Sequence, residues 1–114
     1  MTDVIYINAE EGRKRLNNNA ALYVKLLDRF KSDKNFYEFE IFSSVCEWDR
    51  AQAAAHAVKG IAANLSLKEL FRQSVDVEAQ IKGKSLKPES LANIKICYNE
   101  TLAAVDRVIA QNGQ

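Results

Sequence analysis

Apolar residues recur every three or four positions through most of this chain, and this spacing constrains its fold more than any other feature. Between positions 51 and 65 the recurring residues are Ala51, Ala54, Val58, Ile61 and Leu65. Such a period places apolar side chains on one side of an α-helix, where they can be buried together. Similar series run through later parts of the chain, and no segment carries a strand pattern. The sequence therefore predicts an all-α fold.

Turn and capping residues predict a short first helix and then a long one. Asn8 is a suitable N-cap for the short helix, and a run of asparagines at 17–19 favours a turn after it. From residue 20 to 46 we expect one long helix bent near residue 34, although two shorter helices would give almost the same pattern. Its expected buried residues are Tyr23, Leu26, Leu27, Phe30, Tyr37, Ile41 and Val45.

Three more long helices follow. The first runs from near Trp48 to Asn64, and Ser66 is the expected N-cap of the next, with Glu69 completing a capping box. Pro88 suits the first turn of the last helix. Short connections make sequential helices neighbours, so the prediction is an antiparallel up-down-up-down four-helix bundle. The short N-terminal helix would cover one end of it.

Composition predicts one soluble domain that spans residues 1–114, with a core from about 8 to 111. The chain has 47% hydrophobic and 27% charged residues, which is typical of a compact protein and not of a disordered one. Its net charge of +1 gives no field that would attract nucleic acid or an anionic membrane. No apolar run approaches the roughly 18 residues of a membrane span. We therefore expect a cytoplasmic protein that binds neither nucleic acid nor membrane.

The two cysteines, Cys46 and Cys97, are too few for a disulfide framework. With one histidine and no Cys-x-x-Cys pair, the chain also lacks a standard set of zinc ligands. We expect both cysteines to be small buried residues, and no metal or cofactor site in this chain.

His56 is the only histidine, and it lies on the opposite side of its helix from the apolar series. It should therefore face water or a partner. At spacings of three, four or seven it is surrounded by Gln52, Ala53, Lys59, Gly60 and Ala63. The lysine suits an anion bound at the imidazole. A glycine inside a helix costs about 1 kcal/mol relative to alanine, which suggests that another molecule approaches closely there.

The segment around His56 resembles the signature of histidine phosphotransfer (HPt) domains. The matching residues are His56-Ala57-Val58-Lys59-Gly60, Asn64-Leu65, Leu70 and Val77-Glu78, with Glu47-Trp48 and Leu26-Leu27-Phe30 matching upstream. The likeness covers residues from about 8 to 110. The chain departs from the pattern at Ser66, where the family usually has glycine, and at Val77, where leucine is commoner.

The resemblance implies a phosphoryl carrier of two-component phosphorelays, with no kinase activity of its own. His56 would accept a phosphoryl group from the aspartate of one receiver domain and pass it to another. The expected partners are response-regulator receiver domains and a hybrid sensor kinase. The receiver would supply Mg²⁺, and this chain would hold no cofactor. The absence of a Gly-rich phosphate loop agrees with a chain that does not bind ATP itself.

The resemblance also implies roles for single residues. The outer ring nitrogen, Nε2, would react, and Gln52 is a candidate for the polar neighbour that holds the inner one. Lys59 would stabilise the phosphoryl group, and Gly60 would leave clearance for the partner. Small or apolar residues nearby, Ala53, Ala63 and Leu67, would form the docking surface. Asn64 more readily serves the helix end, and Glu78 either pairs with a lysine or lines the site.

Two other hypotheses stay open. The chain could be a degenerate HPt-like module that docks a receiver or kinase without being phosphorylated. It could instead be an oligomeric helical bundle, in which the last helix forms an intermolecular seam. We expect a monomer, because four apolar series suffice for an internal core. We also expect a freestanding carrier, since Met1 begins the chain, although a domain cut from a longer protein stays possible.

Overall fold

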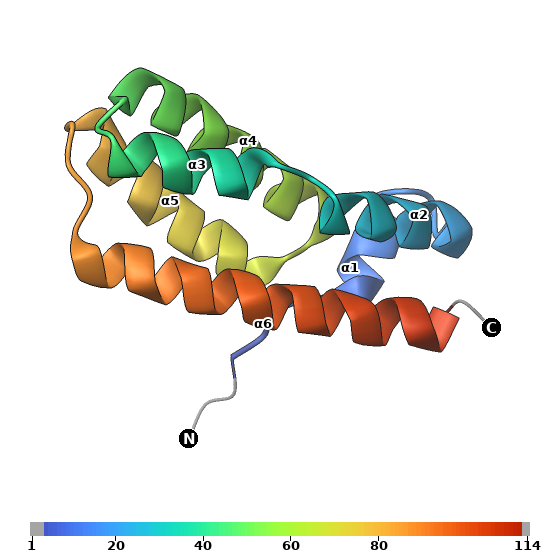
Figure 1. Ribbon diagram of the computed structural model, residues 1–114. Coiled ribbons are helices and arrows are strands. Elements are labelled where there is room, and N and C mark those ends of the chain that lie inside the picture. The colour runs from blue at the N-terminus through green and yellow to red at the C-terminus, as the bar shows by residue number, and fades with distance from the viewer. Residues whose placement is uncertain (1–3, 113–114) are drawn as a thin grey trace.

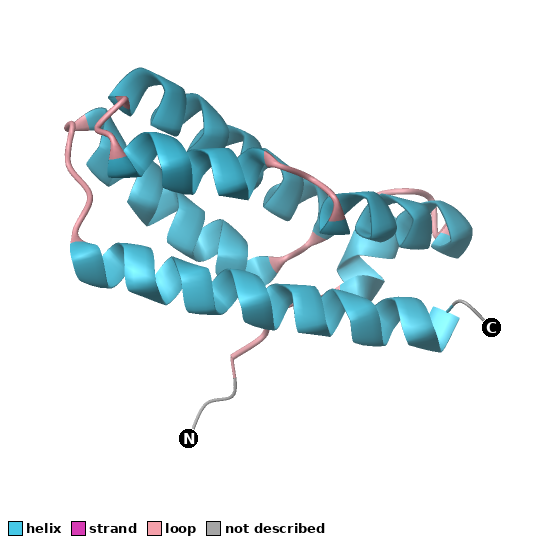
Figure 2. Ribbon diagram, in the orientation of Figure 1, coloured by secondary structure: helices cyan, strands magenta, loops and turns pink. Residues whose placement is uncertain are grey.

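The computed structural model describes residues 4–112, and within that range it contains six α-helices and no strand (Figures 1 and 2). The helices are α1 (Ala9–Lys14), α2 (Ala20–Lys31), α3 (Asn35–Ser44), α4 (Trp48–Leu65), α5 (Lys68–Lys82) and α6 (Pro88–Asn112). The prediction of an all-α fold is confirmed. None of these helices combines the length and the apolar character that a membrane span requires.

The helices form a bundle along α6, which runs the length of the molecule (Figure 1). Helix α3 packs against α4, α4 against α5, and α5 against α6. Helix α2 lies along the other half of α6, and the short α1 contacts both α2 and α4. The site described below lies on α4 and α5, which share the largest interface in the bundle.

The expected single helix over residues 20–46 is two helices. Helix α2 ends before Ser32, and α3 begins at Asn35, whose backbone N–H donates to the Asp33 carboxylate over 2.9 Å. The break changes which side of the second segment faces the core. Phe36 and Phe39 are buried there, together with Ser43. Three residues expected in the core, Tyr37, Ile41 and Val45, are 65%, 40% and 61% exposed.

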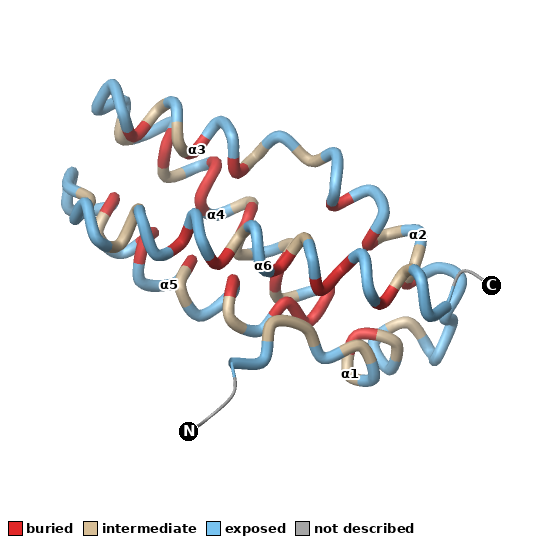
Figure 3. The backbone as a smooth tube through the Cα atoms, turned by 60° about the horizontal axis from the view of Figure 1, so that its bottom comes forward, coloured by how far each residue is buried: buried red, intermediate tan, exposed pale blue. Residues whose placement is uncertain are grey.

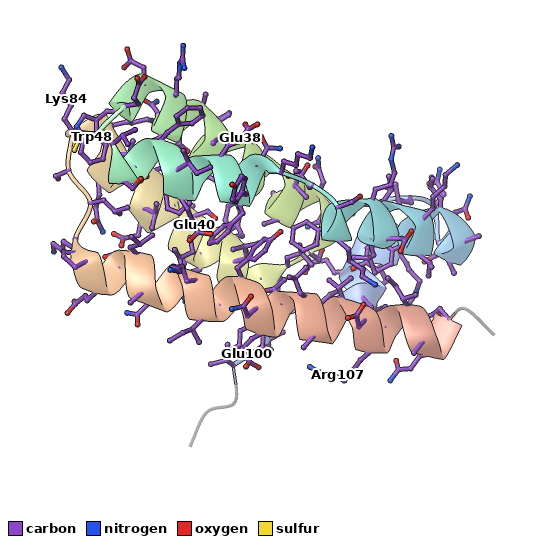
Figure 4. All side chains as sticks on the ribbon, viewed as in Figure 1. Glu38, Glu40, Trp48, Lys84, Glu100 and Arg107 are labelled. Carbon is purple, nitrogen blue, oxygen red and sulfur yellow. The ribbon has the colours of Figure 1, made fainter. Side chains whose placement is uncertain are left out.

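Aromatic side chains fill the space that α3 shares with α6. The rings of Phe36 and Tyr98 stack with centroids 4.1 Å apart, and Phe30 meets Tyr98 edge-on at 5.7 Å. Glu40 points from α3 toward α6, where its Oε2 lies 3.5 Å from Nζ of Lys95 (Figure 4). Buried residues follow the facing sides of the helices (Figure 3).

The turn from α4 to α5 differs from the expected capping box. Ser66 ends α4 in the left-handed conformation, with φ 57° and ψ 42°, so it is a C-cap and not the N-cap of α5. Its buried hydroxyl donates to Oε1 of Glu11 and accepts a hydrogen bond from Arg15. Below it, the Tyr23 hydroxyl donates to the Leu65 carbonyl over 2.7 Å. These bonds hold α1 and α2 against the end of α4.

The two cysteines have different surroundings. Cys97 is buried as expected, and burial raises the pKa of its thiol to about 11. The prediction for Cys46 is wrong, because this residue is exposed. It lies in the turn between α3 and α4 with a φ of 58°, and the chain there has already left the packed side of α3.

Candidate functional site

His56 lies in the middle of α4 and points outward. The residues that α4 buries are Ala51, Ala54, Ala55, Val58, Ala62 and Leu65. The His56 side chain is 68% exposed. The prediction that the imidazole faces away from the core is therefore confirmed.

A buried carboxylate holds the inner nitrogen of this ring. Nδ1 of His56 lies 3.1 Å from Oε2 of Glu78 and 3.4 Å from Oε1. Glu78 belongs to α5, and only 4% of its side chain is exposed. Gln52 was the expected partner, but in the described structure it forms no hydrogen bond with the ring. Glu78 takes that place because α5 packs beside α4 and brings its carboxylate under the imidazole.

Two lysines neutralise this carboxylate. Nζ of Lys59 lies 2.6 Å from Oε1 of Glu78, and Nζ of Lys82 lies 4.0 Å from Oε2. Burial acts to raise the pKa of Glu78, but the hydrogen bonds from Lys59 and His56 outweigh it and lower that pKa. Glu78 is therefore an ionised carboxylate near neutral pH, although it is almost fully buried.

The ionised Glu78 fixes which ring nitrogen carries the proton. A carboxylate can only accept hydrogen bonds, so a neutral His56 must place its hydrogen on Nδ1. The lone pair then lies on Nε2, at the exposed side of the ring. Within residues 4–112 no hydrogen bond involves Nε2. The arrangement is that of an oriented, accessible nitrogen nucleophile.

The surface beside His56 lacks a side chain at Gly60. A Cβ atom added to Gly60 would meet nothing within 4 Å, so the glycine is not required by packing in this fold. Ala53 is exposed and Ala63 is half-buried on the same side of α4, and Asn64 is exposed in its last turn. These positions agree with an open surface beside the imidazole.

Leu67 cannot belong to that surface. It is 0% exposed, because the turn between α4 and α5 directs its side chain into the core. The exposed apolar residues on α5 are instead Phe71, at 39%, and Val75, at 45%. Both lie on the Glu78 side of α5, since positions 71, 75 and 78 are spaced by four and three residues. Phe71 also lines a hollow of about 120 Å³ together with Ala63.

Sequence reasoning missed these two residues and the contact between Glu78 and His56. The spacing of positions 71, 75 and 78 could have indicated these features, because it places the three residues on one side of a helix. That side faces the site if Glu78 contacts His56.

The described part of the chain contains no group of three or more His, Cys, Asp or Glu residues arranged to bind a metal ion. The groups that the site presents are an imidazole, a carboxylate and two ammonium groups. Comparisons with protein-family models, with curated proteins and with solved structures found no match to this chain.

Proposed function

We propose that this protein is a histidine phosphotransfer carrier that accepts a phosphoryl group on Nε2 of His56 and donates it again. One observation carries the proposal: an exposed imidazole whose inner nitrogen is bound by a buried, ionised carboxylate. An incidental surface histidine needs no such partner. The HPt-like residues His56, Lys59, Gly60 and Glu78 lie together here, which adds support.

The transfer step needs no general base. The Nε2 lone pair attacks phosphorus of an aspartyl phosphate on the partner, a P–N bond forms, and the P–O bond to the aspartate breaks. The electron pair of that bond stays on the aspartate as its carboxylate. The imidazole becomes cationic, with hydrogen still on Nδ1, and Glu78 stabilises this charge from 3.1 Å away. Donation to a second aspartate is the reverse reaction.

The neighbouring residues assist by charge and by space. Lys59 holds Glu78 in position and adds positive charge that stabilises the phosphoryl group electrostatically. Gly60 leaves clearance for the partner, and Ala53 and Ala63 line the docking surface. Phosphoryl transfer depends mainly on alignment and charge neutralisation, so Mg²⁺ bound by the receiver supplies what this chain lacks.

The wider proposal follows from that role. The partners are response-regulator receiver domains and a hybrid sensor kinase of a two-component phosphorelay. We also propose that the protein acts in the cytoplasm as a monomer, and that its long helices run in the up-down-up-down order of a four-helix bundle. Its activity is that of a carrier, with no kinase reaction of its own.

A transfer assay tests the proposal. A panel of receiver domains is phosphorylated with radiolabelled acetyl phosphate, freed of the reagent and mixed with this protein. We expect a label on this chain that is stable to base and lost in acid, as for phosphohistidine, and no label on His56→Gln. A chain that binds a receiver without taking label from any phosphorylated member would be a docking module, and the proposal would be wrong.

A further inference from the structure

A second lysine lies beside the same carboxylate, but it is held less closely. Nζ of Lys82 is 4.0 Å from Oε2 of Glu78, whereas Nζ of Lys59 is 2.6 Å from Oε1. The Lys82 side chain is 59% exposed, compared with 27% for Lys59. Lys82 is therefore the cation that can leave Glu78 without breaking a close contact.

Glu78 keeps a close partner on each oxygen without Lys82. Lys59 contacts Oε1, and Nδ1 of His56 contacts Oε2 at 3.1 Å. A buried carboxylate is costly unless such partners are retained. Lys59 and His56 are therefore tied to Glu78 whether or not the ring carries a phosphoryl group.

A phosphoryl group on Nε2 would bring new negative charge to this site. A phosphorylated side chain carries roughly two negative charges near neutral pH. The positive charge of Lys59 already balances the negative charge of Glu78. In the described structure, Glu78 is the only acidic residue within 4.0 Å of the Lys82 ammonium, so Lys82 has no acid of its own.

We propose that Lys82 binds the phosphoryl oxygens directly when His56 is phosphorylated, while Lys59 stays on Glu78. This inference rests on the proposed function of His56. Lys82 Nζ and His56 Nδ1 lie 4.0 Å and 3.1 Å from the same oxygen of Glu78, so these two nitrogens share one acceptor oxygen. Its flexible four-carbon stem allows the ammonium to turn from the carboxylate toward the phosphoryl group. Lys59 then acts at a distance, and Lys82 by contact.

Phosphoramidate allows a test without protein docking. A P–N bond to Nε2 forms, the P–N bond of phosphoramidate breaks, and ammonia leaves with the electron pair of the broken bond. The proteins compared are the wild type, Lys82→Gln and Lys84→Gln. Lys84 lies two residues beyond Lys82 and points outward at the end of the molecule (Figure 4). The control therefore removes the same charge from a lysine that forms no ion pair with Glu78 in the described structure.

Two readouts decide the outcome. For Lys82→Gln we expect an initial phosphorylation rate about threefold to fivefold below wild type, as for the loss of a cation close to the reacting group in water. In a ³¹P NMR titration, the phosphoryl group of this variant should also change from monoanion to dianion at a higher pH, because the Lys82 charge no longer stabilises the dianion. Lys84→Gln should match wild type in both. A structural role of Lys82 would not move the ³¹P titration.

The inference would be overturned if Lys82→Gln behaved as wild type in both readouts, or if Lys84→Gln changed them equally. In those cases His56 would still become phosphorylated, and the proposed function would stand. If the wild type took no phosphoryl group from phosphoramidate or from any receiver domain, the proposed function would be wrong, and the role of Lys82 with it.

Discussion

The ammonium group of Lys59 lies 2.6 Å from Oε1 of Glu78 and joins α4 to α5 at the edge of the core. The carboxylate of this pair is almost fully buried, with 4% of the Glu78 side chain exposed, whereas 27% of the Lys59 side chain is exposed. Removal of one member of a buried pair leaves the other without its partner. The same carboxylate orients His56, so stability and reactivity of this site are coupled through Glu78.

Glu78→Gln should therefore affect both properties. The amide keeps the shape of the side chain but removes its charge, and we expect the free energy of unfolding to fall by about 1–3 kcal/mol. Phosphorylation of His56 should slow, because no negative charge at position 78 then stabilises the cationic ring. Urea unfolding followed by circular dichroism measures the first effect, and the phosphoramidate reaction measures the second.

Glu100→Gln is a suitable control for this variant. Glu100 is an exposed residue of α6, and it points away from the bundle (Figure 4). Glu100→Gln should match the wild type both in urea unfolding and in the rate of the phosphoramidate reaction. A Glu78→Gln protein that unfolds and reacts like Glu100→Gln would show that the carboxylate has neither role.

Gly60→Ala should distinguish an effect on folding stability from an effect on the partner interaction. No atom lies within 4 Å of the added Cβ, and alanine is favoured over glycine inside a helix by about 1 kcal/mol. The variant should therefore unfold at a higher urea concentration. If Gly60 clears space for the partner, transfer from a phosphorylated receiver should slow, whereas the reaction with phosphoramidate should not. Unchanged transfer from the receiver would remove Gly60 from the docking surface.

Gly12→Ala should have the opposite effect on stability. A Cβ atom at Gly12 would overlap the ring of Tyr23, whose side chain is fully buried. Overpacking of this kind costs roughly 1–3 kcal/mol, and here α1 must shift away from α2. Urea unfolding should show the loss. A stability equal to wild type would mean that α1 does not rest on Tyr23 as described.

The contacts of Glu11 predict a pH dependence of stability. Hydrogen bonds from Lys68, Ser66 and Arg15 lower the pKa of Glu11 from 4.5 to about 2. A carboxyl group whose pKa is lowered by folding stabilises the protein above its unfolded pKa, and the effect is lost as the pH falls through the folded one. The stability difference between wild type and Glu11→Gln should therefore be constant above pH 4.5 and shrink between 4.5 and 2.

Thermal unfolding across that pH range measures this difference. Lys68→Gln removes the partner that lowers the pKa of Glu11 most. In the wild-type background this change should reduce the pH dependence of stability. In the Glu11→Gln background it should have no such effect. Equal pH profiles for wild type and Glu11→Gln would contradict the role assigned to this network.

The outward direction of His56 was predictable, because it depends only on positions within one helix. The period of α4 fixes the angle between His56 and buried residues such as Val58, and no tertiary information is needed. The contact with Glu78 was not predictable in the same way. It joins residues 22 positions apart on two helices, and it depends on how α4 and α5 are rotated against each other.

The sequence left open whether residues 20–46 form one helix bent near residue 34 or two helices, and the structure has two. No proline or glycine marks the break, and Asp33, whose side chain accepts a hydrogen bond from the Asn35 backbone there, resembles many surface residues. A break of a few residues changes the rotation of the whole following helix about its axis. Tyr37, which was expected in the core, therefore lies at the surface. Ser66 was misassigned because serine serves several helix ends, and its left-handed backbone is not evident from its chemistry.

The most direct test of the central claim is the state of the two ring nitrogens of His56. Long-range ¹H–¹⁵N NMR correlations report it without overlap, because the chain has a single histidine. In the unphosphorylated protein, at a pH where the ring is neutral, we predict hydrogen on Nδ1. After phosphorylation we predict phosphorus bonded to Nε2, with hydrogen still on Nδ1. Hydrogen on Nε2 of the neutral ring, or a phosphoryl group on any other atom, would contradict the account.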